Sequence, residues 1–83
     1  VLPDAVFESF NTLITRNFNE GVSVVKQEDV LALMMEKGLT RETIFQNHWL
    51  DVEGIYRSSG WEVSYDKPGF SESYPATFTF RLK

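Results

Sequence analysis

The C-terminal third of the chain carries the pattern that most constrains the fold. In residues 61–66 (WEVSYD) and 76–82 (ATFTFRL), apolar and polar side chains alternate one by one. A period of two is typical of strands with one buried and one solvated face, as in an antiparallel sheet. The ten residues from Asp66 to Pro75 (DKPGFSESYP), which join the two segments, are rich in Pro, Gly and Ser. The sequence therefore predicts a hairpin whose loop is far longer than a tight turn requires.

The N-terminal segment predicts a helix. Pro3 and Asp4 favour a helix start, because Pro is tolerated in the first turn and an acidic side chain stabilises the positive end of the helix dipole. Apolar side chains then recur at steps of three and four and form one stripe, made of Phe7, Phe10, Leu13, Ile14 and Phe18. We expect the helix to stop in residues 17–21 (NFNEG), with Gly21 as its C-terminal cap.

Residues 22–38 predict a short strand followed by a second helix. Residues 22–26 (VSVVK) are too few for a helix and rich in β-branched side chains, which favour a strand. Residues 27–38 (QEDVLALMMEKG) place acidic side chains at the start of a helix, Lys37 near its end and Gly38 after it. The expected buried face comprises Val30, Leu31 and Met34, with Leu33 or Met35.

Residues 40–60 predict a third helix, with Thr40 as its N-terminal cap. Its expected apolar side consists of Ile44, Phe45, His48, Trp49, Val52, Ile55 and Tyr56. Gly54 lies inside this segment and costs about 1 kcal/mol relative to Ala in a helix. A kink or break between residues 47 and 54 is therefore an alternative to one continuous helix.

Length and composition indicate one globular domain covering residues 1–83. The chain is 42% hydrophobic and 24% charged, which is typical of a folded domain. The fold class that we predict is α+β, with three helices and a small antiparallel sheet that ends in a long C-terminal hairpin. The chain has no cysteine and no apolar run of the roughly 20 residues that a membrane span needs. We expect a cytoplasmic protein without a membrane partner.

The sequence offers no catalytic apparatus. His48 is the one histidine, and a lone imidazole on an apolar stripe is interpreted as a hydrogen-bonded, partly buried side chain. Asp51 and Glu53 are two residues apart, so on a helix they point about 200° from each other and do not form a carboxylate pair. We interpret them as part of a solvated helix face. Catalytic residues, a metal, a cofactor and a small-molecule substrate are not expected.

The order of these elements resembles the winged helix-turn-helix architecture. The resemblance is carried by the order of helices and strands, by residues 36–40 (EKGLT) as the turn and by the hairpin over residues 61–82. It implies that the helix after the turn lies in the DNA major groove while the hairpin, or wing, contacts the adjacent backbone. By position, the implied groove-facing residues are Thr40, Arg41, Thr43, Gln46 and Asn47. Lys67 in the wing and Arg81 and Lys83 in the last strand are the implied phosphate contacts.

The charge of the chain supports a second hypothesis. The net charge is −4 with pI ≈ 4.8, and the acidic side chains near the implied DNA face are Glu42, Asp51, Glu53, Glu62, Asp66 and Glu72. Binding to phosphates gains most from clustered Lys and Arg. The alternative is an acidic protein-interaction module, an adaptor or inhibitor, that uses the third helix and the aromatic loop. In that loop, Phe70 and Tyr74 either fold back on the sheet or form an exposed contact surface. The architecture marginally favours nucleic acid, and the sequence leaves both partners open.

Overall fold

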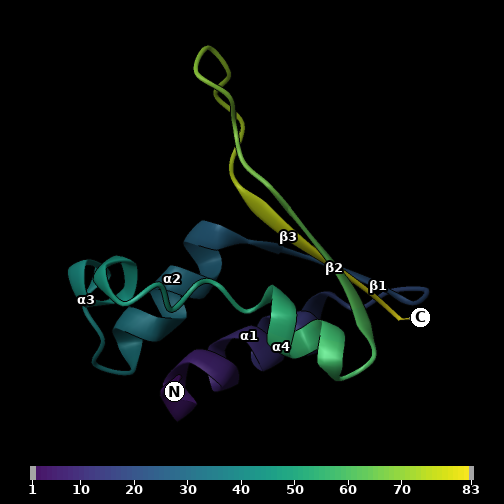
Figure 1. Ribbon diagram of the computed structural model, residues 1–83, viewed down its shortest axis with the longest axis horizontal. Coiled ribbons are helices and arrows are strands. Elements are labelled where there is room, and N and C mark those ends of the chain that lie inside the picture. Colours follow the sequence, from purple (N-terminus) through teal and green to yellow (C-terminus); the bar gives the residue numbers. More distant parts are fainter. Residues whose placement is uncertain (1, 83) are drawn as a thin grey trace.

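The computed structural model describes residues 2–82, which form a mixed α+β domain with four helices and one three-stranded antiparallel sheet (Figure 1). The elements in chain order are α1 (Asp4–Asn17), β1 (Val22–Lys26), α2 (Gln27–Glu36), α3 (Arg41–Gln46), α4 (Glu53–Ser58), β2 (Trp61–Asp66) and β3 (Thr77–Leu82). The predicted α+β class and antiparallel sheet are confirmed. The predicted number of helices is wrong, because residues 40–60 form two short helices. Within residues 2–82, no helix combines the length and apolarity needed to cross a bilayer.

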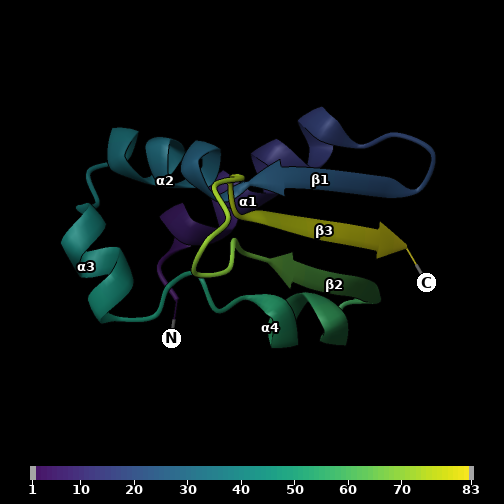
Figure 2. The same ribbon diagram turned by 90° about the horizontal axis from the view of Figure 1, so that it is seen from above.

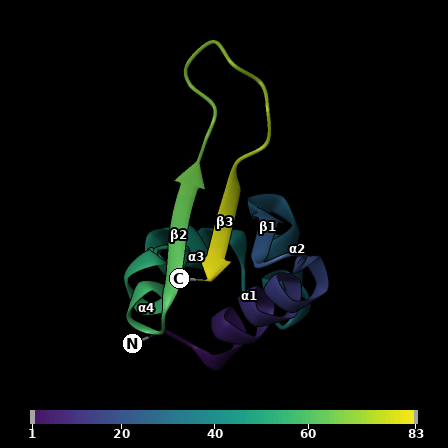
Figure 3. The same cartoon turned by 90° about the vertical axis from the view of Figure 1, so that its right-hand side faces the viewer.

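The sheet has the order β1-β3-β2, so the last strand of the chain lies in the centre (Figure 2). Phe80 is paired with Ser23 on one side and with Val63 on the other. The period-two pattern of the sequence places alternate side chains on the face that the helices cover. On β3 these are Phe78 and Phe80, which are 1% and 0% exposed. The long loop of the hairpin extends away from the helices (Figures 1 and 3).

Aromatic rings join the helices to the sheet. The Phe10 ring of α1 packs edge-on against Phe78, with 5.1 Å between ring centroids, and 6.2 Å from Phe80. Tyr56 of α4 packs against Phe80 at 5.2 Å. Its hydroxyl donates a hydrogen bond of 2.6 Å to Oδ1 of Asn11 in α1. Burial of such rings supplies much of the driving force for folding in a domain of this size.

The end of α1 lies within residues 17–21 as predicted, but its C-terminal cap is a different residue. The helix stops at Asn17, with Phe18 as its C-terminal cap. Gly21 is therefore not the cap. Glu20 and Gly21 have φ values of 51° and 82° and form the turn that leads into β1. Gly21 supplies a left-handed conformation that this turn needs, so its role is in the turn after the helix and not in the helix cap.

The break in the predicted third helix comes from the end of α3. His48 has a φ of 56°, and its N–H donates to the Phe45 carbonyl oxygen at 3.3 Å. The N–H of Trp49 donates to the Ile44 carbonyl oxygen at 3.0 Å. This pair of hydrogen bonds is a Schellman motif, which satisfies the last carbonyls of a helix and ends it.

The same motif ends α2, with a glycine at the left-handed position. Gly38 has a φ of 96°, and the N–H of Leu39 donates to the Met34 carbonyl oxygen at 3.1 Å. Gly54, which we expected to weaken the third helix, lies inside α4. The break over residues 47–52 therefore depends on His48 rather than on Gly54.

Candidate functional site

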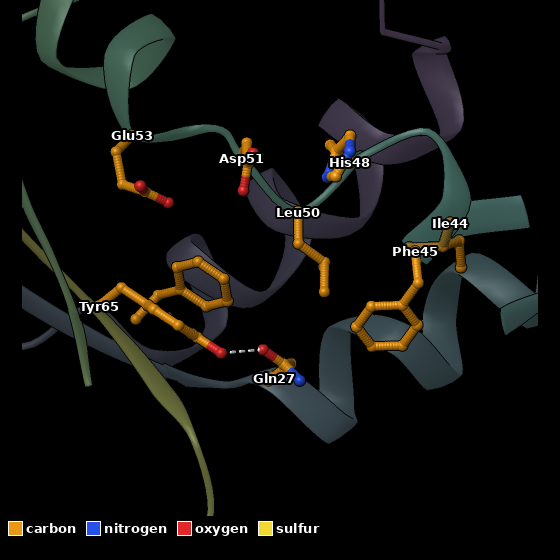
Figure 4. Close-up of a pocket in the computed structure, with 9 residues that line it drawn as sticks. Gln27, Ile44, Phe45, His48, Leu50, Asp51, Glu53 and Tyr65 are labelled. Atoms are coloured by element: carbon orange, nitrogen blue, oxygen red, sulfur yellow. Dashed lines mark hydrogen bonds between the residues drawn. The ribbon is translucent and has the colours of Figure 1, made fainter. Parts of the chain in front are cut away.

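A pocket of about 160 Å³ lies between the α3–α4 segment, the start of α2 and β2 (Figure 4). We call it the acidic pocket. Its lining residues are Gln27, Ile44, Phe45, His48, Leu50, Asp51, Glu53, Tyr65 and Phe78. The buried side chains of Ile44, Leu50 and Phe78 belong to the hydrophobic core. The pocket therefore has apolar walls that the core holds in place, and its polar groups belong to the remaining lining residues.

Tyr65 connects the sheet to α2 inside this pocket. Its ring packs on Phe78, with 4.7 Å between centroids and 39° between planes. Its hydroxyl donates a hydrogen bond of 2.5 Å to Oε1 of Gln27, the first residue of α2. The side chain is nevertheless 40% exposed. The contact with Phe78 and the hydrogen bond to Gln27 therefore fix the orientation of the ring, while part of its surface stays open to a ligand.

Asp51 and Glu53 both line the acidic pocket, which corrects the prediction that they diverge on a helix. Asp51 precedes α4 and Glu53 is its first residue, so helical spacing does not govern their directions. In Figure 4 both side chains extend from the α3–α4 segment toward the side of the pocket where Tyr65 lies. Burial raises the pKa of the Tyr65 phenol, and the negative charges of Glu53 and Asp51 raise it further.

The two carboxylates are not neutralised within the described part of the chain. The ion pairs within residues 2–82 are Lys37–Glu8 and Arg41–Glu28. Among the described residues that line the acidic pocket, none is Lys or Arg. His48 also lines it, and its side chain is exposed rather than partly buried on an apolar stripe, which corrects the sequence interpretation. The pocket therefore carries a net negative charge, since its two carboxylates outnumber the single imidazole.

Three of the predicted binding residues form hydrogen bonds at the two ends of α3. The Thr40 Oγ1 accepts a hydrogen bond of 3.2 Å from the Thr43 N–H, which confirms Thr40 as the N-terminal cap. The two threonine hydroxyls lie 2.7 Å apart. Asn47 Nδ2 donates to the Thr43 carbonyl oxygen at 2.9 Å. Gln46, the last residue of α3, is exposed.

Arg41 contacts two other side chains of the chain itself. Its guanidinium lies 5.3 Å from the centroid of the Phe45 ring. Its Nη1 and Nη2 each lie 3.4 Å from an oxygen of the Glu28 carboxylate. The winged-helix resemblance implied that Arg41 faces the DNA groove, whereas in the structure its charge is balanced by Glu28 on α2.

The two aromatic residues of the loop behave differently. The Tyr74 hydroxyl lies 2.7 Å from the Lys67 carbonyl oxygen and 3.1 Å from Asp66 Oδ1, so Tyr74 folds back on the base of the hairpin. Phe70 is fully exposed at the tip. Of the two alternatives that the sequence left open, Tyr74 follows the first. Phe70 is exposed as the second requires, and its role as a contact surface stays a prediction.

Arg81 lies far from the other predicted residues. It pairs with Val22 and Glu62 on the face of the sheet opposite Phe80. Figure 2 shows α3 and the C-terminal end of β3 at opposite ends of the molecule. Lys83, the other implied phosphate contact, lies outside the described residues. The structure therefore brings Arg41 close to the acidic pocket but does not bring Arg81 into the same surface.

A second hollow of about 390 Å³ adjoins the acidic pocket at the base of the hairpin. We call it the hairpin hollow. It is lined by Gln27, Glu28, Tyr65, Lys67, Pro68, Tyr74, Pro75 and Ala76. Gln27 and Tyr65 line both hollows, so their hydrogen bond lies between them. Neither residue is among the predicted binding residues, although a tyrosine at the end of an alternating strand, beside a long loop, is a signal for a half-exposed aromatic side chain.

Within residues 2–82, no three His, Asp or Glu side chains are grouped as the ligands of a metal ion would be. No protein-family model matches the chain, and neither a curated protein nor a solved structure matches it significantly.

Proposed function

We propose that the protein is a non-enzymatic binding module that recognises a partner protein through the acidic pocket and the hairpin hollow. One observation carries this proposal: the two hollows meet at the Tyr65–Gln27 hydrogen bond and form a continuous aromatic surface. The carboxylates of Asp51 and Glu53 line it without an ion pair inside residues 2–82, against the single ammonium group of Lys67. The Glu28 carboxylate also lines it, but it is paired with Arg41. An aromatic, concave and negatively charged surface suits a basic segment of another protein.

A second candidate is binding to DNA, which the resemblance of the element order to winged helix-turn-helix proteins implies. The strand order β1-β3-β2, the α2–α3 corner and the projecting hairpin are the features in its favour. The charges weigh against it. Arg41 is paired with Glu28, and Arg81 lies at the other end of the molecule from α3. Fold alone does not decide function, so we place the protein partner first.

The protein-partner proposal is tested by affinity purification from source cells with matched variants. The pocket variant combines Asp51→Asn and Glu53→Gln. The control combines Glu20→Gln and Glu62→Gln, which removes the same charge from exposed sites that do not line the hollows. We expect wild type and control to retain one partner, identified by mass spectrometry, that the pocket variant loses and that binds directly after purification. Equal recovery by all three proteins would contradict the proposal.

The DNA candidate is tested separately with a fluorescent duplex of random sequence at low salt. If it holds, binding weakens steeply as salt rises, since displaced counterions drive association with phosphates. Arg41→Ala then reduces the affinity. A flat anisotropy signal at the lowest salt concentration eliminates this candidate.

A further inference from the structure

The size of the acidic pocket limits its occupant. Pockets for drug-sized ligands and cofactors span roughly 300–1,000 Å³, whereas this pocket measures about 160 Å³. That volume suits one amino-acid side chain. The adjoining hairpin hollow is larger and shares Gln27 and Tyr65 with it, which leaves room for the main chain that carries such a side chain.

The charge of the pocket selects a cation. Asp51 and Glu53 lie on the same pocket without an ion pair inside residues 2–82. The Tyr65 hydroxyl is close enough to both for their charges to raise its pKa. Asp51 is exposed and Glu53 is half-buried. Because the two carboxylates line one concave surface beside aromatic rings, their fields add there and attract a positive group.

The aromatic walls favour arginine over lysine. The Phe45 ring lines the pocket, and the guanidinium of Arg41 lies 5.3 Å from the centroid of this ring. The same guanidinium forms an ion pair with the Glu28 carboxylate, with 3.4 Å between nitrogen and oxygen. The chain thus contains one arginine held between an aromatic ring and a carboxylate. A planar guanidinium stacks on rings and pairs with carboxylates by two parallel hydrogen bonds, whereas an ammonium group is a strongly hydrated point charge.

We infer that the acidic pocket binds one arginine side chain of the partner protein, with the guanidinium held by the carboxylates of Asp51 and Glu53 against the Tyr65 ring. This inference rests on the proposed function, since it names the group that the partner contributes. The arginine enters beside the Tyr65–Gln27 hydrogen bond, and the residues that flank it in the partner lie along the hairpin hollow.

The test uses three small probes in a heteronuclear NMR titration of the intact chain: N-acetylarginine amide, N-acetyllysine amide and N-acetylcitrulline amide. Citrulline has nearly the shape of arginine without its charge. We expect arginine to shift the backbone amides of His48, Asp51, Glu53 and Tyr65 in a saturable way. Lysine should bind several-fold more weakly, and citrulline should produce no saturable shift. Equal binding of arginine and citrulline, equal binding of arginine and lysine, or shifts confined to other residues would each overturn the inference.

The variants described above complete the design. Asp51→Asn with Glu53→Gln should weaken arginine binding about tenfold, while Glu20→Gln with Glu62→Gln leaves it unchanged. An equal response of both variants would overturn the inference. If the pocket variant loses the partner protein but no probe binds the wild type, the inference fails and the proposed function stands. If arginine binds in the pocket but partner recovery does not depend on it, the proposed function fails instead.

Discussion

The two ends of the C-terminal hairpin use aromatic side chains in opposite ways. Where β3 crosses the helices, Phe78 and Phe80 are buried and contact Phe10 of α1. At the tip of the loop, Phe70 is fully exposed. Both regions are rich in large rings, so composition does not distinguish them. The difference arises because the strands have helices on one face, whereas the loop extends beyond them (Figure 1).

Tyr65 lies between these two regions and combines their properties. Its ring continues the core by packing on Phe78, while its hydroxyl reaches Gln27 beside the open hollows. Along one hairpin, the aromatic side chains therefore change from core residues, through a wall of the acidic pocket, to a free surface. This order predicts that the loss in the free energy of unfolding on removal of a ring becomes smaller from the base of the hairpin to its tip.

The largest expected effect is at the base. Phe80→Ala removes a fully buried ring that contacts Phe10, Tyr56 and Trp61. A buried Phe→Ala change costs about 3–5 kcal/mol, and small domains unfold with only about 5–15 kcal/mol. Urea denaturation followed by circular dichroism should show a variant that is mostly unfolded or barely stable. Thr79→Ala, on the opposite face of the same strand, is the control. A loss below about 1 kcal/mol for Phe80→Ala would contradict the core that we describe.

An intermediate effect is expected for Tyr56→Phe, and it depends on pH. The substitution keeps the ring and removes the hydrogen bond from the hydroxyl to Asn11, so at pH 7 it should cost about 1 kcal/mol. Burial raises the pKa of Tyr56 to about 12, against about 10 in the unfolded chain. The folded protein therefore binds this proton more tightly. Its contribution is fully present below pH 10 and is lost as the pH rises toward 12.

The pH dependence separates Tyr56 from the other titrating groups. The free energy of unfolding of the wild type should fall by at most about 2 kcal/mol between pH 10 and 12 because of this one phenol. The Phe variant lacks that contribution, so the difference between the two proteins should shrink or reverse over the same range. Denaturation curves at each pH measure it. Parallel stability curves for both proteins would show that the Tyr56 phenol has no raised pKa in the folded state.

Most of the fold could be predicted because it follows from local patterns. Steps of three and four gave α1 and α2, and alternation gave β2 and β3. The third helix was predictable only in part. A break between residues 47 and 54 was one of the two alternatives, and the structure has it, but it was attributed to Gly54. The chain instead stops α3 with a left-handed residue, His48, where Gly or Asn is the usual choice. Histidine adopts this conformation more often than most residues, but the apolar stripe that continues through the segment conceals the signal.

The candidate site was less predictable, because its contacts join distant parts of the chain. Tyr65 and Gln27 are 38 residues apart, and Arg41 and Glu28 are 13 apart. No pattern of period two or 3.6 encodes such pairs. Asp51 and Glu53 were interpreted as part of a solvated helix face, because a continuous helix would point them in different directions. Once the helix breaks at His48, both line one pocket.

The smallest expected effect on stability is at the tip of the hairpin. Phe70→Ala removes a ring that is fully exposed, so the free energy of unfolding should change by no more than about 0.5 kcal/mol. Urea denaturation beside Phe80→Ala gives the direct comparison within one hairpin. A loss above about 1 kcal/mol would mean that Phe70 packs on the domain in solution.

With the fold unchanged, the affinity of the same variant for the purified partner measures how far the binding surface extends beyond the hairpin hollow. A lower affinity would show that the binding surface includes the tip. An unchanged affinity would show that it ends at Tyr74, whose hydroxyl contacts Asp66 and the Lys67 carbonyl oxygen.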